Sequence, residues 1–129
     1  MSKIAIVDDD QESSENLGAF LKDKGFDVVV ETDVDVAVST LVKNRPDLLV
    51  LDLMFPADDA GGFKIAVEIR RTPEIKNLPI IMLTNVNQEF PASFSVRDID
   101  PKWMPIQDFV EKPVNPAKLV EKINKLLKR

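Results

Sequence analysis

Acidic residues stand directly after two of the most apolar runs in the sequence. The run at residues 4–7 is followed by Asp8 and Asp9, and the run at 48–51 is followed by Asp52. Burying an ionised carboxylate without a partner costs on the order of several kcal/mol, so each acid is expected to emerge into a polar site where its run ends. Carboxylates gathered in one place repel one another unless a cation joins them. Hard oxygen ligands favour Mg²⁺, or alternatively Mn²⁺.

A carboxylate can also act as a nucleophile toward phosphorus and form an aspartyl phosphate. Phosphoryl transfer mainly requires positioning and neutralisation of charge. Thr84 ends the apolar run at 80–83, and Lys112 ends the expected strand that begins at Asp108. Their hydroxyl and ammonium groups can hold phosphoryl oxygens. Together with a divalent cation, these side chains form a chemically complete set for accepting a phosphoryl group, and the set includes no separate general base.

The spacing of apolar residues predicts the elements that position these groups. Short, wholly apolar runs are typical of strands buried on both faces of a parallel sheet. We expect strands at residues 4–7, 26–30, 48–52, 80–84 and 108–112. Helical spacing between them predicts helices at 11–24, at about 34–44, after residue 62 and from 116 onward, with Gly25 ending the first and Asn115 capping the last.

This alternation predicts an α/β fold in which a five-stranded parallel sheet is doubly wound, with helices on both of its faces. In such sheets, sites form outside the carboxyl ends of the strands. The fourth helix is expected to be atypical or shortened, because residues 85–106 contain Pro91, Pro101 and Pro105 and show no sustained helical period. Long loops of this kind tend to be functional.

Composition narrows the classes of function. The chain has 129 residues, which we interpret as one domain over 1–129, and a net charge of −5 with a pI near 4.8 argues against a nucleic-acid-binding surface. It has no cysteine and no histidine, which excludes thiolate metal sites and any histidine-based general base or phosphohistidine within the chain. Without an apparent signal peptide or membrane-spanning run, we expect a soluble cytoplasmic protein with no membrane partner.

Four motifs, taken together and in order, resemble the receiver domain of two-component response regulators. They are Val7-Asp8-Asp9, then Pro46-Asp47-Leu48 with Leu51-Asp52-Leu53-Met54-Phe55-Pro56, then Leu83-Thr84, and finally Glu111-Lys112-Pro113. The resemblance covers essentially the whole chain. It implies a flavodoxin-like strand order of 2-1-3-4-5, which places the first and third strands side by side.

The resemblance also implies a role for each matching residue. Asp52 would be the phosphoacceptor. The Mg²⁺ ligands would be Asp9, Asp52 and the backbone carbonyl of Met54, while Asp8 would act mostly through metal-bound water. Thr84 and Lys112 would bind phosphoryl oxygens, and Phe109 matches the aromatic residue that reports the switch.

From this we expect a stand-alone receiver domain that takes a phosphoryl group from a histidine kinase or a histidine phosphotransfer protein and signals to an unknown downstream protein. It would not be an enzyme beyond catalysing its own phosphorylation and dephosphorylation. One alternative is a receiver-fold adaptor that acts without phosphorylation, because Asn85 and the long interval between Thr84 and Lys112 depart from the family pattern. A second is a small Mg²⁺-dependent aspartyl-phosphate phosphatase, but Met54 stands where such enzymes carry a second acid.

Two plainer interpretations stay open at this point. The acids at residues 8–10 could simply cap the helix that follows them. Phe109 could be an ordinary core residue instead of a moving switch.

Overall fold

The computed structural model of the chain describes residues 2–52, 61–84, 108–111 and 114–127. The strands are β1 (Lys3–Asp8), β2 (Asp27–Glu31), β3 (Leu48–Asp52), β4 (Ile80–Thr84) and β5 (Asp108–Glu111). The helices are α1 (Gln11–Asp23), α2 (Ala37–Asn44), α3 (Gly61–Arg70) and α4 (Pro116–Leu126), and a short 3₁₀ turn, η1 (Val34–Val36), leads into α2.

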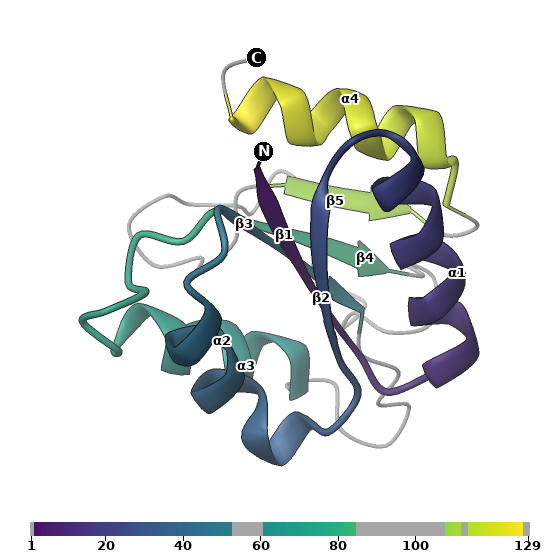
Figure 1. Ribbon diagram of the computed structural model, residues 1–129. Coiled ribbons are helices and arrows are strands. Elements are labelled where there is room, and N and C mark those ends of the chain that lie inside the picture. The colour runs from purple at the N-terminus through teal and green to yellow at the C-terminus, as the bar shows by residue number, and fades with distance from the viewer. Residues whose placement is uncertain (1, 53–60, 85–107, 112–113, 128–129) are drawn as a thin grey trace, which may run out of the picture.

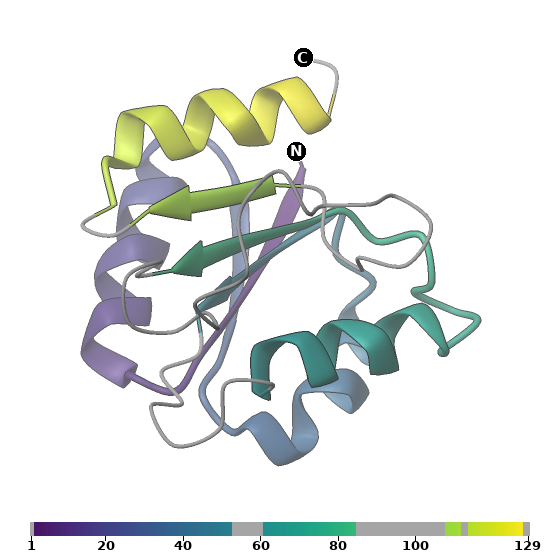
Figure 2. The same cartoon turned by 180° about the vertical axis from the view of Figure 1, so that it is seen from behind.

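The five strands form one parallel sheet in the order β2-β1-β3-β4-β5. Figures 1 and 2 show α1 and α4 on one face of this sheet and α2 and α3 on the other. The doubly wound α/β fold and its strand order are therefore confirmed. No helix within the described ranges is long and apolar enough to cross a membrane.

The element boundaries differ slightly from the sequence-based ones. The second strand begins at Asp27 and not at Phe26, because the Phe26 N–H donates to the Leu21 carbonyl (3.1 Å) and so belongs to the turn that leaves α1. The fifth strand is described over Asp108–Glu111, and its predicted last residue, Lys112, lies outside the described residues. The expected atypical fourth helix falls at residues 85–106, all of which lie outside the described residues.

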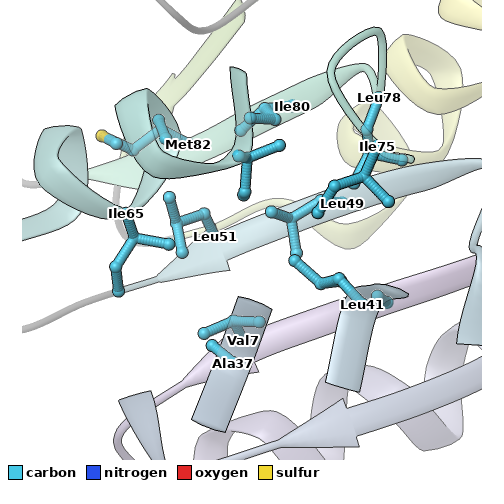
Figure 3. Packing of buried hydrophobic residues seen from close by; sticks show 13 residues of the cluster. Val7, Ala37, Leu41, Leu49, Leu51, Ile65, Ile75, Leu78, Ile80 and Met82 are labelled. Atoms are coloured by element: carbon cyan, nitrogen blue, oxygen red, sulfur yellow. The ribbon is translucent and has the colours of Figure 1, made fainter. Parts of the chain in front are cut away.

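Alternation along the strands divides the core into two layers. Ala5, Val7, Leu49 and Leu51 belong to the cluster under α2 and α3, and Figure 3 shows Val7, Leu49 and Leu51 packing toward Ala37, Leu41 and Ile65 of those helices. The intervening residues Ile4, Ile6, Leu48 and Val50 belong to the cluster under α1 and α4. Continuing the alternation, Asp8 and Asp52 fall on the α1/α4 side of the sheet.

Arg70, at the end of α3, anchors the loop that leads into β4. Its guanidinium group donates to the carbonyl of Lys76 (3.0 Å) and to that of Leu78 (2.6 Å). Burial lowers the pKa of Arg70. Because two carbonyls of one loop share a single rigid donor, the start of β4 is held in place relative to α3.

Gly25 occupies a position that favours glycine for backbone reasons alone. Its φ is +95°, and a Cβ built there would meet nothing within 4 Å. We therefore expect Gly25→Ala to lower the free energy of unfolding by about 1 kcal/mol, since an L residue is strained at positive φ. Urea unfolding followed by circular dichroism would measure this change. Gly25→Asn should lose less, and an alanine variant as stable as the wild type would contradict the assignment.

Candidate functional site

Asp8 and Asp52 lie side by side at the carboxyl edge of the sheet. They end β1 and β3, and the parallel register pairs them directly. Both side chains are buried, with exposed fractions of 1% and 4% respectively. Two carboxylates that the sequence separates by more than forty residues thus share one site, because neighbouring parallel strands end at the same level.

The pKa of Asp8 reflects its burial and the carboxylates around it. Its pKa is raised from 3.8 to about 6, chiefly because burial disfavours the charged form. A hydrogen bond from the Asp10 backbone N–H to Asp8 Oδ1 (2.9 Å) acts in the opposite direction. The negative charges of Asp52, Asp9 and Asp10 raise the pKa further. The site therefore carries an excess of negative charge that a bound cation would offset.

The three consecutive acids after β1 do different things. Asp10 caps α1, with its side chain accepting the Ser13 N–H (3.1 Å), as the helix-capping interpretation proposed. Asp8 is instead buried beside Asp52, and Asp9 is exposed. Capping thus accounts for Asp10 but gives no reason for the burial of Asp8.

A cavity of about 470 Å³ opens beside the two carboxylates, on the face covered by α1 and α4. Its lining residues come from the carboxyl ends of three strands, one side of α1 and the start of α4: Asp8, Asp10, Ser13, Asn16, Leu17, Phe20, Asp52, Leu83, Val114 and Pro116. The sequence reasoning missed Ser13 and Asn16. Their spacing with Leu17 and Phe20 puts all four on one helix face, which was the available signal.

The described residues contain no group of three or more acidic side chains close enough to hold a metal by themselves. Mg²⁺ usually keeps several waters and takes only one or two carboxylates, so a full acidic cage is not required. Asp52 supplies one such carboxylate, and Asp8 lies beside it, where it can act through metal-bound water. In addition, Oδ1 of Asp52 is buried and accepts no hydrogen bond within the described part of the chain. The oxygen donors present therefore fit a Mg²⁺ ion.

The remaining predicted site residues are placed only in part. Thr84 ends β4, where its backbone pairs with Glu111 of β5, so it lies at the same edge of the sheet as Asp52. Phe109 pairs with Met82 in the interior of the β4–β5 ladder. Met54 and Lys112 lie outside the described residues. The backbone thus brings Thr84 to the level of the site, beside Glu111 at the end of β5.

Comparison with known proteins agrees with this geometry. The family model of the response regulator receiver domain matches residues 4–124. The chain is 34% identical over 129 residues to the phosphate regulon transcriptional regulatory protein PhoB of Rhizobium meliloti, and 32% identical over 127 residues to the regulatory protein VanRc of Enterococcus gallinarum. It spans about half the length of these relatives, 53% and 50% respectively.

Solved structures match over nearly their full length. A putative response regulator from Chloroflexus aurantiacus superimposes with a TM-score of 0.78 at 30% identity, covering 99% of this chain and 98% of the other. The chemotaxis response regulator CheY4 of Vibrio cholerae gives a TM-score of 0.77 at 25% identity, covering 97% and 98%. The family model, the relatives and the fold agree, and the chain belongs to the family of response regulator receiver domains.

Proposed function

We propose that this receiver domain accepts a phosphoryl group on Asp52 in a Mg²⁺-dependent reaction and works as a signalling switch. The observation that carries the proposal is the placement of Asp52. It ends the buried strand β3 beside Asp8 and lines the cavity that α1 and the start of α4 border. Membership of the receiver family suggests that the donor would be a phosphohistidine on a histidine kinase or a histidine phosphotransfer protein. The absence of histidine from the given sequence agrees with a pure acceptor.

In this reaction an oxygen of the Asp52 carboxylate attacks the phosphorus atom of the donor. The new P–O bond forms as the P–N bond breaks, and the imidazole leaves with the electron pair of that bond. Bound Mg²⁺ supplies positive charge that offsets the phosphoryl oxygens. Asp52, Asp9 and the Met54 carbonyl would hold the ion, with Asp8 acting through its bound water. Thr84 and Lys112 would bind the phosphoryl oxygens.

The phosphorylated state would change the surface that a downstream protein reads. Contacts from the phosphoryl group to Thr84 and Lys112 favour one of two arrangements of the chain, and ligands shift such equilibria by their difference in affinity. Phe109 would report this shift. The domain would not act as an enzyme on other substrates, since Met54 offers no second acid to protonate a leaving group.

The proposal predicts phosphorylation without a kinase. Incubated with Mg²⁺ and acetyl phosphate, the wild-type protein should gain the mass of one phosphoryl group, measured by intact-mass spectrometry. Peptide mapping should place the group on Asp52. The adduct should disappear when EDTA replaces Mg²⁺, because the uncompensated carboxylates then repel the incoming phosphate.

Two results would favour the alternatives. No adduct on the wild type, with either acetyl phosphate or a phosphorylated kinase, would favour an adaptor that acts without phosphorylation. Continued turnover of a generic phosphate ester above background would favour a phosphatase.

A further inference from the structure

We propose that Asp10 is a positioning residue for the Mg²⁺ site: by capping α1 it holds its own backbone amide against Asp8 and so fixes the direction of the Asp8 carboxylate. This inference rests on the proposed function, because it gives Asp8 a part in holding the ion. Asp10 itself would contact neither the ion nor the phosphoryl group.

Three hydrogen bonds meet at Asp10. Its N–H donates to Asp8 Oδ1 (2.9 Å), and its Oδ1 accepts the N–H of Ser13 (3.1 Å). Its carbonyl oxygen accepts the N–H of Ser14 (3.0 Å) as the first bond of the helix. The residue therefore joins the site on one side to the first turn of α1 on the other.

That first turn is itself held against the sheet. Ser14 is fully buried, and its hydroxyl donates to the Gln11 carbonyl (2.8 Å). One turn further along, a Cβ added to Gly18 would lie 3.4 Å from Val30 and 3.5 Å from Val28, so α1 packs closely on β2. Because the helix has little room to move, a cap that fixes Asp10 to the helix also fixes the Asp10 amide in relation to the sheet.

The orientation of Asp8 depends on this amide. The bond occupies Oδ1, which restricts rotation of the carboxylate about its Cβ–Cγ bond. Partners of this kind orient a group of the metal site without contacting the metal themselves, and losing one typically lowers metal affinity about 10- to 100-fold. Asp8, buried at the sheet edge beside Asp52, is the group whose direction matters here.

Two variants of Asp10 distinguish the effect of losing its helix cap from the effect of losing its negative charge. Asp10→Ser keeps a good capping oxygen and the backbone N–H, whereas Asp10→Ala keeps only the N–H. Both remove the same negative charge, so any difference between them reports the cap. Isothermal titration with Mg²⁺ should show binding to Asp10→Ala about tenfold weaker than to Asp10→Ser. In the metal-free protein, the residue-10 amide should exchange with solvent several-fold faster in the alanine variant, as measured by NMR.

The possible results distinguish a failure of the positioning role of Asp10 from a failure of the proposed Mg²⁺-dependent function. If the wild type and Asp10→Ser bind Mg²⁺ and Asp10→Ala binds it equally well, while unfolding more readily, the cap is only structural and the positioning role is overturned. If the wild type does not bind Mg²⁺ at all, the proposed function fails and this role fails with it. Loss of affinity confined to Asp10→Ala, accompanied by faster exchange of the amide, supports the role.

Discussion

Asp52→Asn should abolish phosphorylation of this domain by acetyl phosphate while leaving the protein folded. The amide has almost the size and shape of the carboxylate, but it is a poor nucleophile and carries no charge. It also removes one of the negative charges that raise the pKa of Asp8. In EDTA at neutral pH the variant should therefore be at least as stable as the wild type, which separates loss of chemistry from loss of fold. Intact mass and urea unfolding measure the two effects.

A matched control lies at the other end of the same strand. Asp47 immediately precedes β3, and its Oδ2 accepts the backbone N–H of Lys3 (2.8 Å), at the amino edge of the sheet. Asp47→Asn should be phosphorylated like the wild type, because Asn keeps an acceptor oxygen there and the site lies at the opposite edge. An adduct that persists in Asp52→Asn would assign the phosphoacceptor to another residue and contradict the proposal.

Asp8→Asn should change how stability depends on pH. The pKa of Asp8 is raised from 3.8 in its ordinary state to about 6 in the fold, so the folded state holds the proton more tightly. The stabilisation linked to this proton is fully present below pH about 4 and is lost as the pH rises to about 6. For the metal-free wild type, the loss amounts to at most about 3 kcal/mol, at 1.36 kcal/mol for each pKa unit.

Asparagine has no proton to lose in this range and keeps an acceptor for the Asp10 N–H. The free energy of unfolding of Asp8→Asn should therefore match that of the wild type near pH 4 and exceed it near pH 7. Urea unfolding in EDTA at intervals between pH 4 and 7.5 measures the difference. Asp23→Asn, at an exposed position at the end of α1, should keep the wild-type slope. A slope that survives in Asp8→Asn would assign the pH dependence to another group.

Mg²⁺ should also change the stability of the folded protein, through the same carboxylates. A cation that binds the folded state and not the unfolded one stabilises it by mass action. It also favours the ionised form of the carboxylates that hold it. Saturating Mg²⁺ should therefore offset the loss of stability of the wild type above pH 6, through the pair Asp8 and Asp52.

The strands could be predicted from the sequence because they leave a local signal. A wholly apolar run such as 48–51 has few alternatives to a strand buried on both faces, and the order of the elements along the chain then restricts the connections. Boundaries were less predictable. Phe26 looks like the start of a strand by composition, but its N–H closes the turn after α1. The hydrogen bond that closes the turn after a helix does not alter the spacing of apolar residues, so the sequence pattern does not reveal it.

Residue types alone indicate which side chains end the strands, and with them the chemistry expected of Asp8, Asp9, Asp52 and Thr84. How the acids divide their roles depends on contacts between residues that are far apart in the chain. The register of β1 against β3 pairs Asp8 with Asp52, and the packing of α1 turns Asp10 into a cap with its amide on Asp8. Burial and neighbouring negative charge raise the pKa of Asp8, and both depend on residues that are distant in the chain. Three adjacent aspartates that look alike in the sequence therefore differ physically in the fold.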